Sequence, residues 1–487
     1  MQLTKFYLTS LVVLLILHGC AVNPATGQQN LVLMSEQQEI ALGRDTHQQV
    51  LQHYGKYDDP QLQNYVQNVG ERLASNSHRN NLVYRFTVLD SKEVNAFALP
   101  GGYIYITRGL MSYLNSEAEL AAVLGHEIGH VTARHAVRQY SATQIANIGA
   151  TLGALFIPGM AGAGNTLVQI FGTALLRGYG REHELEADRL GAEYLARSNY
   201  TPQAMLNVIG VLKNQEQFET QLAKAEGREP NVYHGLFSTH PDNDTRLQEV
   251  IAHAGTPTNV MPEQVGREAY MQQMDGVVFG DSAKEGTIRG HNFYHATLGI
   301  ALNFPLGWKI DNQPDRLIFT PPNGDALMQV GLEDINKRIS PREFMITRLG
   351  LDNLSQDQAI NIHGNDAHTG IAPVNTSLGK RAARFTVIYY NNQAYIIAGF
   401  TKNSSAMPQY DRYFLETAQS FHAMTDNEYA LAKPLYLKTI QATGDTTFEM
   451  LAKQTPLEHY PVEQLRLLNG LYPQGQPTDG MLLKIIE

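Results

Sequence analysis

The chain has 487 residues, more than one hydrophobic core usually serves, so we expect about three domains. Hydrophobic residues make up 43% and charged residues 17%, which is typical of globular protein and excludes a disordered or fibrous class. The formal net charge is −10 and no basic run is visible, which argues against nucleic acid as a partner. The only cysteine, Cys20, excludes both a disulfide within the chain and a thiolate metal cluster.

The N-terminal segment resembles the signal peptide of a bacterial lipoprotein. Lys5 precedes an almost entirely apolar run over 6–17, which is too short and ends too abruptly for a spanning helix. The sequence Leu17-His18-Gly19-Cys20 resembles a lipobox, although His18 departs from the residue usual there. The resemblance implies that residues 1–19 are removed and that Cys20 carries acyl chains, which anchor the protein to a membrane. Ala21, the next residue, resembles the residue found in lipoproteins of the outer membrane. An ordinary signal peptide with an incidental cysteine is the alternative.

The next segments mix helical and strand patterns. Apolar spacing predicts helices over 35–55 and about 61–74, a strand over 83–89, and strand-forming residues punctuated by Gly and Pro over 95–107. Ser116 begins the next helix, with Glu119 three residues on as in a capping box, and we expect this helix to continue to about Tyr140.

No charged residue occurs between Arg138 and Arg177. One interpretation is a lid that faces a membrane or a substrate, and the other is two packed helices joined near Pro158-Gly159. We favour the packed helices, because polar residues and the break shorten each apolar run below a spanning length.

The segment His126-Glu127-Ile128-Gly129-His130 is an H-E-x-x-H pattern within the capped helix. Residues four apart share a helix face, so both imidazoles are placed to bind one Zn²⁺ while Glu127 serves as the general base for a water molecule. A catalytic zinc needs a third protein ligand and an open position. The pattern therefore predicts a metallopeptidase site that is completed elsewhere in the chain.

A helix expected over 181–196 supplies the candidate third ligand. Glu184 and Asp188 are four residues apart and share one face, so Glu184 is placed to complete a His₂Glu site. Asp188, one turn on, is placed to accept a hydrogen bond from the far nitrogen of a ligand histidine. The alternative is an acidic, solvated helix in which Arg181 and Arg189 pair with these carboxylates.

Five motifs in order resemble the zinc metallopeptidase family that includes the HtpX and BepA envelope proteases and the CAAX prenyl proteases. The resemblance covers about 35–250, and its motifs are Asn95 to Gly102, Gly109-Leu110, the H-E-x-x-H helix, Glu184-x-x-Ala187-Asp188, and Thr239-His240-Pro241 with Arg246. It implies a gluzincin site with His126, His130 and Glu184 as ligands of one zinc ion.

The resemblance also implies roles for flanking residues. An extended substrate peptide is expected to bind along Asn95, Ala96, Phe97 and Ala98 by main-chain hydrogen bonds, although an ordinary packed strand is not excluded there. His240 is expected either to approach the metal and stabilise the oxyanion or to be structural. Arg246 is expected to pin that loop by pairing with a carboxylate, for which Asp188 is the candidate.

Two further domains are expected after a linker over 255–290. Short strand patterns, an Asn391-Asn392 hairpin turn and a late helix indicate a small α/β sandwich over 291–425, which weakly resembles PsbP/DcrB-like domains. In the last segment, 426–487, a strand, helices over 444–453 and 462–469, and a closing strand give a βααβ order that resembles a LysM module. LysM modules bind peptidoglycan, although a degenerate module that only packs is the alternative.

The fold class expected is therefore α+β: a mainly helical zincin-type metallopeptidase domain over 20–254, the sandwich and the LysM-like module. The expected function is a zinc-dependent endopeptidase, lipid-anchored in the envelope of a Gram-negative-type bacterium, that acts on unfolded or misassembled envelope proteins. The alternatives are a chaperone that binds extended chains without cutting and a peptidoglycan hydrolase. Glu127 argues against the chaperone, since a pure binder has no use for a base beside the metal.

Overall fold

The structure is a computed structural model that describes residues 20–27, 29–142, 179–226, 230, 263–313, 316–376 and 379–487. The predictions for the signal peptide, for most of the uncharged segment, and for His240 and Arg246 lie outside these residues. The chain divides into two compact units. Unit 1 comprises Met1–Gln221, Asn231–Phe279 and Tyr436–Glu487, and unit 2 comprises Leu222–Pro230 and Gly280–Leu435.

Unit 1 begins with a short hairpin and two capped helices. Strands β1 (Cys20–Val22) and β2 (Gln29–Leu31) pair antiparallel, and α2 (Glu36–Tyr54) and α3 (Pro60–Ala74) follow. Ser35 caps α2 in a capping box with Gln38, while Asp59 caps α3 and Pro60 occupies its first turn. Both predicted helices are confirmed within a residue or two.

A three-stranded sheet lies against these helices. Its strands are β3 (Arg85–Leu89), β4 (Ala96–Leu99) and β5 (Tyr103–Thr107), in the order β3-β5-β4, with β3 parallel and β4 antiparallel to β5. Gly101 and Gly102 make the β4–β5 turn with φ of 79° and 88°, a conformation that favours glycine. Among the described strands, β4 is thus the terminal strand of its sheet.

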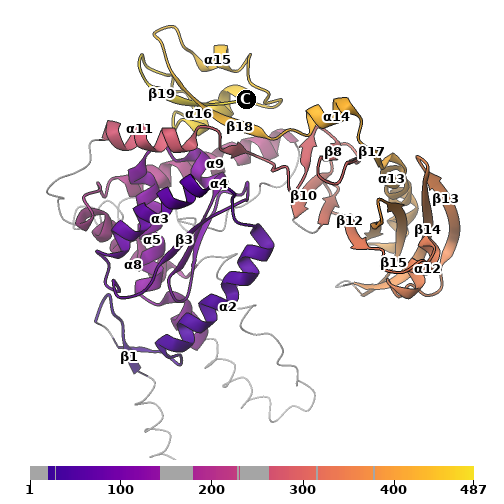
Figure 1. Ribbon diagram of the computed structural model, residues 1–487, viewed down its shortest axis with the longest axis horizontal. Coiled ribbons are helices and arrows are strands. Elements are labelled where there is room, and N and C mark those ends of the chain that lie inside the picture. The colour runs from indigo at the N-terminus through magenta and orange to yellow at the C-terminus, as the bar shows by residue number, and fades with distance from the viewer. Residues whose placement is uncertain are drawn as a thin grey trace, which may run out of the picture. The chain divides into compact units, whose positions relative to one another are not determined.

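The central helix of unit 1 is α5 (Glu117–Thr132), which follows the short α4 (Arg108–Tyr113) and packs on α3 and β4 (Figure 1). Ser116 caps it by accepting from the backbone of Glu119, as predicted. The predicted continuation to Tyr140 is wrong, because the backbone turns at Ala133 and at Arg134, where φ is 56°. A second helical run begins at His135.

Three further helices complete the first part of unit 1: α8 (Arg181–Arg197), α9 (Ala204–Glu226) and α11 (Glu263–Met274). The expectation of a bare linker over 255–290 needs correction in its described part, which holds α11, β6 (Val278–Phe279) and β7 (Thr287–Arg289). Tyr270 explains why α11 is ordered, since its ring is fully buried and its hydroxyl donates to the carbonyl oxygen of Met111.

The C-terminal segment packs into unit 1. It contains β18 (Leu435–Gln441), α15 (Phe448–Leu451), α16 (Pro461–Leu468) and β19 (Leu482–Ile486). The strand order β19-β18-β6 joins this segment to the strand that follows α11. Helix α15 is shorter than the predicted 444–453, because Thr446 closes a turn onto Thr443 and Thr447 becomes the cap.

Unit 2 is built on a seven-stranded antiparallel sheet in the order β10-β11-β12-β16-β15-β14-β13. Its strands are β10 (Lys309–Gln313), β11 (Arg316–Thr320), β12 (Ala326–Asp334), β13 (Ser355–Ile362), β14 (Asn365–Thr376), β15 (Gly379–Tyr390) and β16 (Gln393–Thr401). The predicted hairpin is confirmed, since Asn391 and Asn392 join β15 to β16 with positive φ.

A smaller sheet and three helices complete unit 2. The sheet has the order β17-β9-β8-β7, with β8 (Asn292–His295), β9 (Ile300–Asn303) and β17 (His422–Ala423). The helices are α12 (Pro341–Thr347), α13 (Met407–Ser420) and α14 (Asp426–Leu431), with a 3₁₀ turn at Ser404–Ala406. The expectation of a chain that mixes helices and sheets is confirmed. Within the part of the chain that the structure describes, no helix has both the length and the apolar character needed to cross a membrane.

Candidate metal centre

Helices α5 and α8 cross at the site, and small residues allow the close approach. A side chain at Gly129 would place its Cβ 2.8 Å from the carbonyl oxygen of Ala187, and one at Gly191 would lie 3.0 Å from the backbone nitrogen of His126. Gly129, which occupies a variable position of the H-E-x-x-H motif, is therefore a point of contact between the two helices. This crossing brings the histidines of α5 beside the carboxylates of α8.

Three ligand atoms converge at the crossing. The Nε2 atoms of His126 and His130 are 2.9 Å apart, and Oε2 of Glu184 lies 3.4 Å from the first and 3.8 Å from the second. Both histidines are buried, at 1% and 4% exposure, and the Glu184 side chain is 14% exposed. Glu184 is oriented by the backbone N–H of Tyr179, which donates to its other oxygen at 2.9 Å.

The far side of His126 is held by α8. Asp188 Oδ1 lies 2.8 Å from Nδ1 of His126. A carboxylate only accepts, so the imidazole donates from Nδ1, and Nε2 is the nitrogen that faces the convergence point. The structure thus brings Asp188 to the ligand histidine that the sequence left unspecified.

The electrostatics of the three groups favour a cation between them. Although burial lowers the pKa of His126, hydrogen bonds to Asp188 and Glu184 raise it to about 10. Burial and the charge on His126 hold the pKa of His130 well below its ordinary value. Protonation of one imidazole therefore disfavours protonation of the other.

The donor set fits a zinc ion. In a tetrahedral zinc site with bonds of about 2.0–2.2 Å, ligand atoms are about 3.3–3.5 Å apart. The three atoms observed here all lie within 4.8 Å of one another and bracket that spacing. Two imidazole nitrogens and one carboxylate are also the ligand types of catalytic rather than structural zinc.

Glu127 is positioned as the motif requires. It follows the first ligand on α5 and is 3% exposed. Burial raises its pKa to about 7, with the charge on His126 acting in the opposite direction. The carboxylate therefore lies in a poorly solvated site beside the ligands.

The remaining predicted residues fall in two groups. Ala96, Phe97 and Ala98 lie on β4, with Asn95 just before it, and the side chains on the strand are buried. His240 and Arg246 lie outside the described residues. Cys20 begins β1, opposite Leu31.

Several residues at the site were missed by the motif reasoning. His135 lies 2.8 Å from His130 between their Nδ1 atoms, and Glu186 lies 3.1 Å from the other nitrogen of His135. Tyr179 stacks on His130 with ring centroids 4.4 Å apart, and His183 stacks on His135 at 4.3 Å. The available signal was two further histidines, His135 close after the motif and His183 directly before Glu184, but a straight helix over 116–140 points His135 away from His130.

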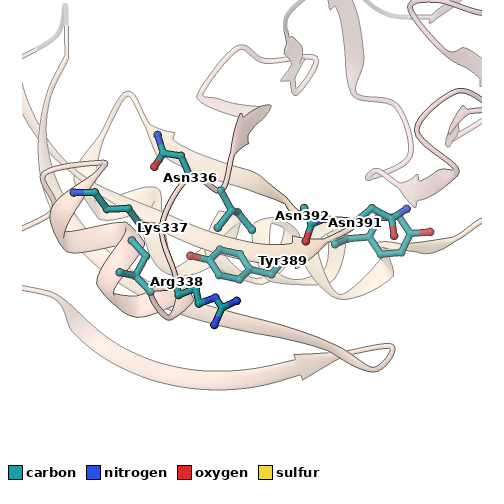
Figure 2. A pocket seen from close by; sticks show the side chains of 9 residues that line it. Asn336, Lys337, Arg338, Tyr389, Asn391 and Asn392 are labelled. Atoms are coloured by element: carbon teal, nitrogen blue, oxygen red, sulfur yellow. The ribbon is translucent and has the colours of Figure 1, made fainter.

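A second concave region lies in unit 2 and offers different chemistry. This pocket of about 500 Å³ is lined mainly by the loops after β12 and β15, including Lys337, Arg338, Tyr389, Asn391 and Asn392 (Figure 2). It contains no carboxylate or imidazole. Among the described residues, His126, His130 and Glu184 form the group of side chains that could hold a metal ion.

Comparison with known proteins agrees with this geometry. Residues 60–254 match peptidase family M48. The match covers less than half of the chain. It confirms the resemblance to the zinc metallopeptidases, and the matched range contains the candidate ligands His126, His130 and Glu184.

Curated relatives match part of the chain. The beta-barrel assembly-enhancing protease of Yersinia pestis is 31% identical over 235 residues, which cover 46% of each chain. The protein of that name in Escherichia coli K12 is 34% identical over 202 residues, or 39% of each chain. The mitochondrial metalloendopeptidase OMA1 of Arabidopsis thaliana is 30% identical over 207 residues, or 42% of this chain and 38% of that one. The chain thus spans less than half the length of these relatives.

Among solved structures, the cyanobacterial PsbP protein of Synechocystis sp. PCC 6803 aligns with 30% of this chain and 98% of its own. The sequence identity is 16% and the TM-score is 0.23. This likeness is too low to support an inference about unit 2.

Proposed function

We propose that this chain is a zinc-dependent endopeptidase that hydrolyses peptide bonds of unfolded or misassembled proteins in the envelope of a Gram-negative-type bacterium. The observation that carries the proposal is the convergence of His126, His130 and Glu184 around a point beside Glu127. The M48 match and the names of the relatives, which are proteases, support it.

In this proposal His126, His130 and Glu184 hold the zinc ion. When bound, zinc supplies a Lewis acid that polarises a carbonyl oxygen and acidifies a water molecule. Glu127 takes a proton from the attacking water and returns it to the leaving nitrogen of the peptide. Because the side chain is buried, its carboxylate is weakly solvated and suited to both transfers.

An extended substrate segment would bind along the free edge of β4. Strand β4 pairs with β5 on one side, and α5 packs against it, so its other edge runs beside the helix that carries the motif. Main-chain hydrogen bonds to Ala96–Leu99 would hold the peptide without regard to its sequence, as a quality-control enzyme requires. His240 is proposed to stabilise the oxyanion, with Arg246 positioning its loop.

The location and accessory roles are also proposals. Acylation of Cys20 would attach the protein to the outer membrane. The C-terminal segment, whose βααβ order motivates a LysM-like assignment, would contact peptidoglycan, and unit 2 would bind or space partners.

The direct test measures metal content and proteolysis together on the purified mature chain and its Glu127→Gln variant. We expect one zinc per chain in both proteins and cleavage of an unfolded outer-membrane protein by the wild type alone. A rate loss on the order of 10²–10⁴ is expected for removal of a general base.

Other results would redirect the proposal. Zinc without cleavage by the wild type would favour a chaperone that binds extended chains. Release of muropeptides from sacculi, with casein left intact, would favour a wall hydrolase. Undiminished turnover by Glu127→Gln would exclude this residue as the base.

A further inference from the structure

The Nδ1 side of His130 faces a set of polar groups that the zinc motif does not include. His130 Nδ1 lies 2.8 Å from His135 Nδ1, and His135 Nε2 lies 3.1 Å from Oε2 of Glu186. Arg138 donates to the same oxygen of Glu186 at 2.7 Å, and the Asn23 amide donates to the other at 2.9 Å. The series is buried, since His135 has no exposure and the side chain of Glu186 has 13%.

The contacts determine the direction of each hydrogen bond. Arg138 donates to one oxygen of Glu186 and Asn23 to the other, so the carboxylate acts as the acceptor in this series. His135 must then donate from Nε2, and a neutral ring has its lone pair on Nδ1. The proton between the two Nδ1 atoms therefore belongs to His130, whose Nε2 lone pair is left facing Glu184.

The backbone is bent to make this contact. On a straight helix, residues five apart are separated by about 140° around the axis, so His135 would point away from His130. The turn at Ala133–Arg134 removes that separation, with Arg134 in the left-handed region at φ 56°. The side chain of Arg134 secures the turn by donating to Glu39 at 2.8 Å and to the carbonyl oxygen of Met34 at 3.0 Å. A left-handed backbone conformation is unfavourable for a residue with a side chain, so surrounding contacts must hold Arg134 in place.

We propose that His135 and Glu186 are positioning residues, which fix the tautomer and the orientation of His130 toward a divalent metal ion, with Asn23 and Arg138 holding Glu186. His126 is oriented by one carboxylate, that of Asp188, through a direct hydrogen bond. The two ligand histidines are thus oriented in different ways, one by a carboxylate and one by an imidazole backed by a carboxylate. This inference rests on the proposed metal site.

The test measures metal affinity rather than turnover. Zinc dissociation constants are obtained by chelator competition for the full mature chain and for His135→Leu, His135→Asn and Glu186→Gln. Loss of the acceptor in His135→Leu should weaken zinc binding by about 10- to 100-fold. The Asn side chain keeps an acceptor close to the Nδ1 position, so His135→Asn should recover most of the affinity. Glu186→Gln should fall between the wild type and His135→Leu.

A spectroscopic readout and a matched control complete the design. The visible absorption of the Co²⁺-loaded protein should shift in His135→Leu and return toward the wild-type spectrum in His135→Asn. His53→Leu removes an exposed imidazole from the last turn of α2 and is the matched control, which should bind zinc like the wild type.

Three outcomes would overturn the inference. If His135→Leu binds zinc as tightly as the wild type, His135 does not position the ligand. If His135→Asn is as weak as His135→Leu, the ring acts by packing and not as an acceptor. If the wild type binds no zinc, the proposed function fails with it, whereas zinc binding without proteolysis leaves this inference standing and removes only the peptidase activity.

Discussion

The metal cluster of His126, His130 and Glu184 and a second buried cluster around Lys484 lie in the same unit but are built differently. Lys484 is fully buried, and its Nζ donates to the carbonyl oxygens of Ser112 and Leu114 at 2.5 and 2.6 Å. Its backbone N–H and C=O both bond to the Asn469 side chain. The side chain and both backbone groups of Lys484 thus have complementary hydrogen-bond partners.

The metal cluster, by contrast, gathers two imidazole nitrogens and a carboxylate oxygen around one point. The nitrogens are 2.9 Å apart and lie 3.4 and 3.8 Å from the oxygen, and the partners behind them fix that arrangement. These are the ligand types of a catalytic zinc site, so the convergence marks a place suited to a metal cation. A complementary cluster such as that of Lys484 instead indicates structural support.

The largest expected effect is a loss of zinc affinity, which should follow from a change in the metal cluster and not from one in the Lys484 cluster. Glu184→Gln removes an anionic ligand and should weaken zinc binding by more than about 100-fold, beyond the effect of changing an outer hydrogen-bond partner. The apoprotein should be slightly less stable, because the negative charge of Glu184 stabilises the charged imidazole of His126. Chelator competition and thermal unfolding of the apoprotein measure the two quantities.

Glu182→Gln is the matched control, since Glu182 is exposed on the same helix two residues earlier. It should leave zinc affinity unchanged. Wild-type affinity in Glu184→Gln would remove Glu184 from the ligand set and end the contrast between the clusters.

The second prediction concerns the Lys484 cluster, where stability should change and zinc affinity should not. Lys484→Ala leaves a cavity and two unpaired carbonyl groups and should lower the free energy of unfolding of unit 1 by about 3 kcal/mol. Zinc affinity of the folded protein should not change. The only tryptophan, Trp308, lies in unit 2, so the unfolding of unit 1 is better followed by hydrogen exchange of α5 amides.

Lys438 offers the control for this change. It pairs with Asp275 on the surface at 3.0 Å with 47% of its side chain exposed, so Lys438→Ala should cost under about 1 kcal/mol. Equal costs for the two lysine variants would show that the Lys484 cluster carries no special structural weight.

The two clusters also differ in what the sequence could predict. The i, i+4 spacings of His126 with His130 and of Glu184 with Asp188 place each pair on one helix face, so the likely ligands could be chosen without coordinates. The crossing of α5 with α8 then completed the arrangement through Gly129 and Gly191. Local periodicity likewise predicted α2, α3 and the hairpin of β15 and β16.

Contacts between distant segments were beyond such reasoning. No Gly or Pro marks the turn at Arg134, and its partner Glu39 lies 95 residues away, so His135 could not be assigned to the site. Lys484 lies in a short apolar strand, and the carbonyl groups that it contacts are 370 and 372 residues away in the sequence. Long-range partners decide both positions.

A smaller effect tests how directly a carboxylate must act on a ligand. Asp188→Asn keeps an acceptor for Nδ1 of His126 but loses the negative charge, and should weaken zinc binding by about tenfold. Glu193→Gln, on the exposed surface of the same helix where it pairs with Arg197, is the control and should leave affinity unchanged. A loss as large as that of Glu184→Gln would mean that Asp188 does more than orient the ring.

The smallest expected effect concerns a half-exposed pair in unit 2, where complementarity is present but solvent weakens it. Although partial burial lowers the pKa of His422, hydrogen bonds to the carbonyl oxygen of Ser420 and to Glu428 raise it above 6.5. Burial acts to raise the pKa of Glu428, but bonds to Thr425 and His422 lower it below 4.5. Stabilisation by the charged imidazole is complete below pH 6.5 and is lost as the pH rises through the raised value, and stabilisation by the carboxylate is lost only as the pH falls below 4.5.

Unit 2 should therefore be most stable between about pH 4.5 and 6.5 and lose under about 1 kcal/mol by pH 8, since a partly exposed ion pair contributes little. Denaturant unfolding followed by Trp308 fluorescence reports on this unit, because the indole packs against Tyr410 and Phe414 in its core. His422→Gln should abolish the difference between pH 6 and pH 8. If the difference survives in that variant, another group is responsible for it. A loss of several kcal/mol by the wild type between pH 6 and pH 8 would mean that solvent exposure does not weaken such a pair.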